Sequence, residues 1–258
     1  MGHPLLELKG NVAVVIGGNS GIGRATALAL AHAGADVVPT ARRLDQVKAV
    51  ADEIEALGRR SLRVTCDVGD RASLENLLRL VIKEFGKVEI LVNSAGYNQR
   101  AATLNFAEAD WNRMLDTNLT GALRTCQIFG AHMIERRYGR IINIASMGSF
   151  LALYEVVAYC ASKAGLASLT KSLAIEWARH QICVNAIAPG YFRTPLTEKL
   201  LTGTPRGEEV LMRTPMNRFG ELEELAGAAV FLASPAAAFV TGTILPVDGG
   251  FLASGVNR

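Results

Sequence analysis

Short runs of β-branched and apolar residues alternate along this chain with longer segments of helical periodicity. Seven such runs are expected to form strands, at residues 12–17, 36–40, 61–66, 89–94, 140–146, 182–188 and 242–247. Helical patterns lie near residues 22–33, 44–57, 73–85, 108–134, 157–178 and 222–233. A strand, helix, strand order implies parallel strands joined by right-handed crossovers, with helices on both faces of the sheet. The pattern therefore predicts an α/β fold with a doubly wound, seven-stranded and mainly parallel sheet.

No internal repeat, low-complexity tract or linker interrupts this alternation, so we expect a single domain over residues 1–258. The composition, 50% hydrophobic and 20% charged, suits a large buried core. Residues 189–221 depart from the pattern because they are rich in Pro, Gly, Thr and charged residues. A long segment of this kind is uncommon between core elements unless it is a lid or a binding loop. We predict a substrate lid there; a surface excursion without such a role is the alternative.

Composition argues against several classes of protein. The net charge of +3 is too small to drive nucleic-acid binding through counterion release. The most apolar long stretch, residues 226–240, is too short for a membrane span and is interrupted by Pro235. The first residues show no basic leader followed by an apolar core, so we expect a cytoplasmic protein. The four cysteines and four histidines have no ligand-like spacing, and we expect no metal site.

A glycine-rich loop, GGNSGIG at residues 17–23, follows the first predicted strand and opens the first predicted helix. Glycines at its first, fifth and seventh positions let the backbone turn tightly and approach a pyrophosphate, whose charge the helix N-terminus favours. A plain turn is the alternative, since such a loop alone is weak evidence. We expect a dinucleotide to contact the loop residues Gly17, Asn19, Ser20, Gly21, Ile22 and Gly23.

The end of the second predicted strand indicates which dinucleotide. A carboxylate there would bind the ribose 2′-hydroxyl, but this chain has Ala41, Arg42 and Arg43. Arginine matches a phosphate in charge and geometry. We therefore expect NADP, bound by Arg42 and Arg43. If both arginines are only solvated surface residues, NAD stays an acceptable cofactor.

Two further motifs lie at the ends of predicted strands, where ligands bind in open α/β sheets. They are CDV at residues 66–68 and NSAG at residues 93–96. Asp67 is suited to accept a hydrogen bond from the adenine amino group, and Ala95 and Gly96 let a cofactor pass close to the backbone. From these motifs we expect cofactor contacts at Asp67, Val68, Asn93, Ala95 and Gly96.

Seven motifs in this order, GGNSGIG, NSAG, TNLTG, INIAS, YCASK, APGYFRT and VDGG, resemble the short-chain dehydrogenase/reductase family over essentially the whole chain. The resemblance implies a Rossmann-type, dinucleotide-binding fold. Departures are small: Ile16 stands where Thr is usual, and Ser94 where Asn is usual. Neither removes a catalytic group, although Ile16 lacks a hydroxyl that would brace the NSAG turn.

The resemblance also implies a catalytic tetrad, formed by Asn118, Ser146, Tyr159 and Lys163. Tyr159 and Lys163 are four residues apart, which places both on one helix face. A free phenol has a pKa of ~10, and lowering it toward ~7 takes roughly 4 kcal/mol, against ~0.2–0.5 kcal/mol from an exposed pair. We therefore expect a partly dry cleft in which Lys163 and an oxidised nicotinamide both stabilise the phenolate. Ser146 would bind the substrate oxygen, Lys163 the nicotinamide ribose, and Asn118 a water linked to Lys163.

Further expectations come from the same resemblance. Pro189, Gly190 and Thr194 would anchor the nicotinamide carboxamide. The last strand and the long helices at 108–134 and 157–178 would form the interfaces of a homotetramer.

The substrate is less constrained. Asn98, Arg100 and Arg193 lie near the expected cleft, with Ser146 at its reacting end, and suit a hydroxylated or anionic ketone such as a keto sugar acid. The segments around them look most like the gluconate 5-dehydrogenase branch. A 3-oxoacyl carrier-protein reductase is the alternative, although Ile175 stands where those reductases often carry an Arg. A non-catalytic NADP-binding sensor is a third hypothesis. The intact tetrad argues against it, because a sensor does not need an ordered proton relay.

Overall fold

A sheet of six parallel strands forms the centre of the described part of the chain, in the order β2-β1-β3-β4-β5-β6. The structure is a computed structural model that describes residues 3–194, 197, 201–255 and 257. Its strands are β1 (Val12–Ile16), β2 (Asp36–Thr40), β3 (Ile90–Asn93), β4 (Gly139–Ile144), β5 (Ile182–Pro189) and β6 (Ile244–Val247). This arrangement confirms the predicted α/β fold with a doubly wound, parallel sheet.

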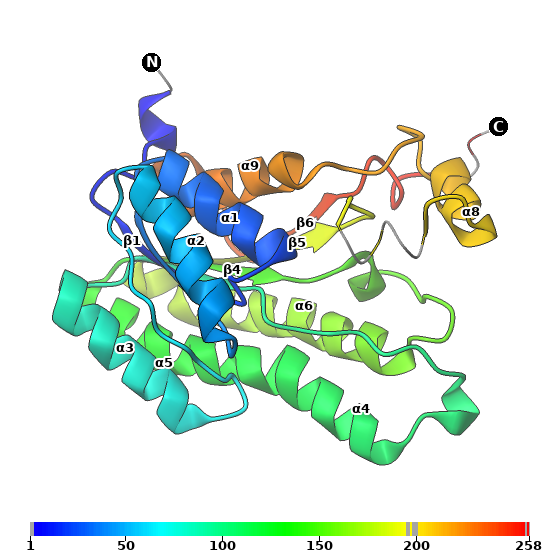
Figure 1. Cartoon of the computed structure of the whole chain (residues 1–258), viewed down its shortest axis with the longest axis horizontal. Coiled ribbons are helices and arrows are strands. Elements are labelled where there is room, and N and C mark those ends of the chain that lie inside the picture. Colours follow the sequence, from blue (N-terminus) through cyan, green and yellow to red (C-terminus); the bar gives the residue numbers. More distant parts are fainter. Residues whose placement is uncertain (1–2, 195–196, 198–200, 256, 258) are drawn as a thin grey trace.

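Helices cover both faces of the sheet (Figure 1). One face carries α1 (Gly21–His32), α2 (Leu44–Ala56) and α9 (Leu222–Ala233). The other carries α3 (Arg71–Phe85), α5 (Gly121–Arg136) and α6 (Val157–Trp177). The remaining helices and helical turns are α4 (Glu108–Leu115), α8 (Pro205–Arg213), η1 (Pro4–Leu6), η2 (Thr103–Asn105), η3 (Asp116–Thr120), η4 (Met147–Ser149), η5 (Ala178–His180) and η6 (Pro235–Ala237).

Strand β1 shows why a segment that was predicted to be a strand can be apolar at every position. Ala13 and Val15 belong to the core cluster shared with α1 and α9. Val12, Val14 and Ile16 belong to the cluster shared with α3 and α5. Successive side chains of a strand point to opposite faces, so a strand covered on both faces buries every residue. Since all strands are parallel, their carboxyl ends share one edge, where the loops can form a binding site.

Residues 61–66 were predicted to be a strand, and the structure shows that this was wrong. Two backbone hydrogen bonds join the ends of this segment to β2 and its flank: Val37 N to Arg60 O and Cys66 N to Ala41 O, both 3.1 Å. Between these bonds lies Pro39, which has no N–H to donate. The ladder therefore lacks its central bond, and the segment lies along β2 without strand geometry.

The predicted helix at residues 108–134 is divided in two. A π-helical turn, η3, separates α4 from α5. A π turn interrupts the regular backbone ladder and is often found at functional sites. It places Asn118, a residue of the predicted tetrad, at the interruption.

The described part of the predicted lid, residues 189–221, contains helix α8. Phe192 pairs with Gly220 in an isolated parallel bridge, so the two ends of the segment lie side by side. Helix α8 lies between them in the chain and away from the helices that cover the sheet (Figure 1). Residues 195–196 and 198–200 lie outside the described residues. Across the described residues, no helix is both long and apolar enough to cross a membrane.

Candidate active site

The four predicted tetrad residues gather at the carboxyl edge of the sheet. They come from three places in the fold: Ser146 after β4, Tyr159 and Lys163 on α6, and Asn118 in η3. Ser146 and Lys163 are each 6% exposed and Asn118 is 1% exposed. A Cβ placed on Gly96 would lie 3.1 Å from Asn118 Oδ1 and 3.6 Å from Lys163 Nζ. The structure therefore brings the NSAG turn close to Asn118 and Lys163, and Tyr159 of the same tetrad is partly buried.

Burial controls the charge states of Lys163 and Tyr159. Lys163 Nζ donates to Ile144 O at 2.7 Å and lies 5.7 Å from the centre of the Tyr159 ring. Loss of water around the ammonium lowers the pKa of Lys163 to about 8. Burial also raises the pKa of Tyr159, and a hydrogen bond with Ser146 opposes that rise. The protein without a cofactor therefore favours a protonated phenol.

A short turn after β4 positions Ser146 beside α6. Ser146 Oγ accepts a hydrogen bond from Gly148 N at 3.1 Å, which caps η4. Ser149 Oγ donates to the backbone oxygen of Lys163 at 2.7 Å. Since the Ser146 oxygen is already an acceptor, its own O–H remains able to donate. The turn thus links the serine to the helix that carries the phenol and the ammonium.

Asn118 uses its amide to fasten protein groups together. Its Oδ1 accepts from Tyr97 N at 3.0 Å, and its Nδ2 donates to Tyr97 O at 2.9 Å. Nδ2 also donates to Ser162 Oγ at 3.2 Å. Both ends of the amide are therefore engaged by the protein, whereas the sequence suggested that the residue holds a water. The water link to Lys163 stays a prediction, and the observed contacts join the NSAG turn to α6.

The glycine-rich loop folds tightly against the start of α1. Gly17 has φ 79°, in the left-handed region that favours glycine. A Cβ on Gly23 would lie only 2.1 Å from Gly17 O, so the loop folds closely onto the helix start. Ser20, the N-cap of α1, makes no side-chain capping bond, which leaves the first N–H groups of α1 available to an anion. Ser94 N donates to Ile16 O at 2.9 Å, so a backbone bond braces the NSAG turn without a hydroxyl.

Residues at the expected adenosine end are exposed. Arg42 and Arg43 follow β2, and neither guanidinium has an ion pair or hydrogen bond among the described residues. Asp67 is exposed, and its Oδ1 accepts from Gly69 N at 2.9 Å. Asn19 Nδ2 donates to Gln46 Oε1 at 2.5 Å at the rim of the loop. Both guanidinium groups are exposed, and their contact with a 2′-phosphate stays a prediction.

Two residues predicted to bind the cofactor lie in the core. Asn93 is 5% exposed, and its Nδ2 donates to Asn143 Oδ1 at 2.9 Å. Val68 is 8% exposed and packs against Gly121. The structure does not bring the Asn93 side chain to the expected cleft, because as part of β3 it points between the strand and the helices.

The expected nicotinamide end lies where β5 leaves the sheet. Pro189 is the last residue of β5, and Gly190 N donates to Val247 O at 2.8 Å. A Cβ on Gly190 would lie 2.6 Å from the Asp248 Cα, so the backbone passes close to the VDGG segment. The Thr194 and Thr197 hydroxyl groups are 2.9 Å apart. These contacts fix the start of the lid segment.

The arginines predicted to bind substrate are paired with carboxylates. Arg100 Nε lies 2.6 Å from Glu155 Oε2, and Arg193 Nε lies 3.0 Å from Glu221 Oε1. Asn98 is exposed, with no hydrogen bond of its side chain among the described residues. An anionic substrate would have to displace a carboxylate to bind either arginine, whereas Asn98 is available at once.

Sequence reasoning missed Glu155 and Tyr191. Glu155 has φ 62°, uncommon for a residue other than glycine, and its backbone oxygen accepts from Ala101 N at 3.0 Å. Glu155 and Arg100 are 55 positions apart in the sequence, so no local pattern indicates that they pair. Tyr191 follows Gly190 inside the APGYFRT motif, so its position in that motif was a usable signal.

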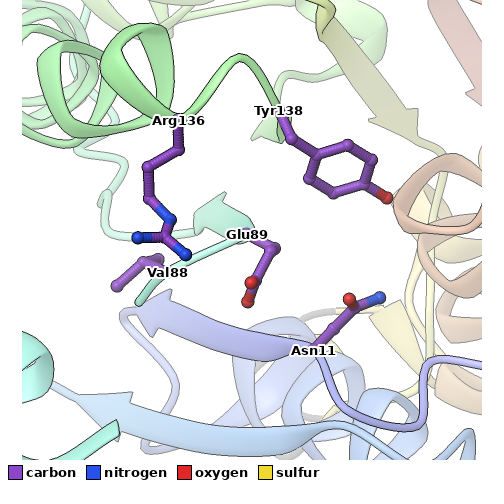
Figure 2. Close-up of a pocket in the computed structure, with 5 residues that line it drawn as sticks. All are labelled: Asn11, Val88, Glu89, Arg136 and Tyr138. Carbon is purple, nitrogen blue, oxygen red and sulfur yellow. The ribbon is translucent and has the colours of Figure 1, made fainter. Parts of the chain in front are cut away.

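Two cavities flank opposite ends of the sheet. One, of about 330 Å³, is lined by Tyr191 and by residues of the lid and the VDGG segment. The other, of about 290 Å³, lies at the amino edge of the sheet. Figure 2 shows Asn11, Glu89 and Arg136 projecting into it from separate elements. Glu89 Oε2 already accepts from Val12 N at 2.8 Å. None of the tetrad residues lines either of these two cavities.

A family model described as enoyl-(acyl carrier protein) reductase matches residues 16–252, a range that includes the glycine loop, the tetrad and the VDGG segment. The match defines the class of protein as an oxidoreductase with a dinucleotide-binding fold. The chain belongs to the short-chain dehydrogenase/reductase family.

Similar proteins share this chain's full length. The gluconate 5-dehydrogenase of Gluconobacter oxydans (strain 621H) is 38% identical over 255 residues, covering 98% of this chain and 100% of the relative. The 2-dehydro-3-deoxy-D-gluconate 5-dehydrogenase of Escherichia coli (strain K12) is 42% identical over 248 residues, covering 96% and 97%. A crystal structure of a gluconate 5-dehydrogenase from Burkholderia cenocepacia J2315, in complex with NADP and tartrate, superposes with a TM-score of 0.93 at 36% identity. That superposition covers 97% of this chain and 98% of the other.

Proposed function

We propose that this protein is an NADP(H)-dependent oxidoreductase that interconverts a ketone and a secondary alcohol on a polar substrate such as a keto sugar acid. The observation that carries the proposal is the grouping of the buried Ser146 and Lys163 with the partly buried Tyr159 at the carboxyl edge of the sheet. The substrate class draws support from two relatives that are named as dehydrogenases of gluconate and of 2-dehydro-3-deoxy-D-gluconate. NADP draws support from the related structure that contains it.

The chain's own residues form a cradle that fits a dinucleotide. In this proposal the loop from Gly17 to Gly23 holds the pyrophosphate, and Arg42 with Arg43 holds the 2′-phosphate. Lys163 binds the nicotinamide ribose, while the backbone at Gly190 positions the nicotinamide. When bound, the dinucleotide supplies or accepts a hydride, and its oxidised ring contributes a positive charge beside the phenol.

Tyr159 is the proton donor in the direction of reduction. Because burial raises the pKa of Tyr159, the phenol is protonated before the substrate arrives. Ser146 holds the substrate oxygen through the O–H that its contact with Gly148 N leaves free. The phenolate that remains after proton transfer is stabilised by the ammonium of Lys163, and a proton from solvent restores it. Oxidation of an alcohol runs these steps backward and needs the phenolate first, so it favours higher pH.

A 3-oxoacyl carrier-protein reductase is the second candidate, favoured by the acyl-carrier description of the matching family model. Such a reductase has to dock an acidic carrier. In this chain the later part of α6, the helix that carries the Tyr-Lys pair, presents Ile175, which is 81% exposed and uncharged, where those reductases often carry an Arg. The apolar side chain offers no attraction to an acidic partner, and this favours a small polar substrate.

A panel of substrates separates these functions. NADPH and NADH oxidation would be followed with keto sugar acids, neutral keto sugars and 3-oxoacyl thioesters. We expect turnover of a keto sugar acid with NADPH and weaker turnover with NADH. Preferential use of the thioesters would establish the second candidate, and no turnover across the panel would favour the non-catalytic sensor.

The assembly and the lid form part of the same proposal. Phe239, before β6, is fully exposed, and Ile175 projects from α6 into solvent. Exposed apolar side chains at these places suit the interfaces of a homotetramer. Residues 189–221 would close over the substrate. Light scattering of the purified protein tests the tetramer: a monomer would rule it out.

A further inference from the structure

Strand register places Tyr191 at the same edge of the sheet as the reacting groups. Ile144 of β4 pairs with Ile187 of β5, so Ser146 is level with Pro189 in the next strand. Neighbouring strands lie about 4.8 Å apart. Tyr191 follows two residues later on the same carboxyl edge. Its backbone is held there, since Tyr191 O accepts from Gly220 N at 2.9 Å.

The Tyr191 ring is fixed by its neighbours. Its centre lies 5.9 Å from that of Phe251, with 59° between the ring planes. This tilted packing is favourable for aromatic pairs. Phe251 is itself 5% exposed, and the guanidinium of Arg213 lies 4.8 Å from its ring centre. A ring packed in this way holds its hydroxyl in a defined position.

The hydroxyl of Tyr191 has no hydrogen-bond partner in the described part of the chain. The side chain is partly buried and lines the cavity of about 330 Å³ between the lid and the VDGG segment. It also lies close enough to Tyr159 for an ionised Tyr191 to raise the pKa of that phenol. A positioned hydroxyl without a partner beside a cavity can both donate and accept.

We propose that the Tyr191 hydroxyl binds a hydroxyl group on the carbon next to the reacting carbonyl, which makes the enzyme selective for α-hydroxy ketones. The inference rests on the proposed function and names a feature of its substrate. Ser146 and Tyr159 bind the carbonyl oxygen, and an oxygen on the adjacent carbon lies within hydrogen-bond distance of it. A second hydroxyl supplied from the neighbouring strand can reach that oxygen. A site built to bind a substrate hydroxyl discriminates against analogues that lack it.

Tyr191→Phe tests this because it removes the hydroxyl and keeps the ring against Phe251. Acetoin and butanone form a matched pair that differs by one hydroxyl next to the carbonyl. NADPH oxidation would give kcat/KM for both ketones with the wild-type protein and the variant. We expect kcat/KM of the variant to fall about tenfold for acetoin, as the loss of one hydrogen bond of ~1.4 kcal/mol implies. For butanone, kcat/KM should stay within about twofold of the wild-type value.

Tyr138→Phe is the control for loss of a tyrosine hydroxyl, since Tyr138 lines the cavity at the opposite edge of the sheet (Figure 2). This control substitution should leave kcat/KM for both ketones unchanged. An equal loss on acetoin and butanone in Tyr191→Phe would show a structural role and overturn the inference, as would no loss on acetoin. If the wild-type protein reduces neither these ketones nor any in the wider panel, the proposed function itself fails.

Discussion

Replacing Lys163 with Met should stabilise the cofactor-free protein while abolishing turnover. The side chain is only 6% exposed, and burial lowers its pKa from 10.5 to about 8. At about 1.36 kcal/mol per unit, keeping the ammonium charged at neutral pH costs about 3 kcal/mol of unfolding free energy. Met removes this cost but leaves Ile144 O without the donor that contacts it at 2.7 Å. That loss costs about 1–3 kcal/mol, so the net gain is about 0–2 kcal/mol.

The stability advantage of Lys163→Met over the wild-type protein should decrease as pH rises. The folded pKa of Lys163 lies below its unfolded value, so between the two the unfolded chain binds more protons. Wild-type stability therefore rises with pH across this window. The cost of the buried ammonium is fully present below about pH 8 and is lost as pH approaches 10.5. The advantage of Lys163→Met should be largest near neutral pH and disappear at alkaline pH.

Differential scanning fluorimetry without cofactor, at equal protein concentrations and from about pH 7 to about pH 10, measures this advantage. We expect Lys163→Met to melt higher by up to about 8 °C at the neutral end. Lys171→Met is the matched control, because Lys171 is an exposed lysine on the same helix. A difference in Tm that does not change with pH would refute the reasoning. A variant that melts below the wild-type protein at neutral pH would refute it as well.

Three further outcomes are expected. Tyr159→Phe should abolish turnover while NADPH still binds, as measured by fluorescence titration, and retained activity would contradict its role as proton donor. Arg42→Ala should weaken NADPH binding about tenfold and leave NADH binding nearly unchanged by calorimetry; equal effects on both would count against a 2′-phosphate contact. Gly23→Ala should weaken both dinucleotides more than tenfold, because its Cβ would lie 2.1 Å from Gly17 O. Gly227→Ala, with nothing within 4 Å, is its control.

The tetrad residues could be named from the sequence through the family resemblance, and local geometry supports their grouping. Four residues separate Tyr159 from Lys163, and a helix places such residues on one face. Ser146 is the last residue of the fifth predicted strand, residues 140–146. The alternating pattern then brings the ends of parallel strands to one edge. These steps need no knowledge of distant contacts.

The remaining features depend on partners that are distant in the chain. Arg100 was expected to face substrate, but it pairs with Glu155, whose position depends on the loop before α6. Asn93 was expected to face the cofactor, but it bonds to Asn143 across two strands. The amide of Asn118 is engaged because a π turn brings it to the Tyr97 backbone. None of these pairings follows from periodicity or from a motif.

The proline in β2 limits how the sheet can grow. An exposed edge strand with a full row of unpaired N–H groups invites pairing with another chain. Here Pro39 removes one donor, and residues 61–66 occupy the remaining edge through bonds at each end. The edge is therefore closed to a strand from a second molecule, and protection against edge-to-edge aggregation is built in at this side. Any extension of the sheet between copies of the chain is restricted to the opposite edge, at β6.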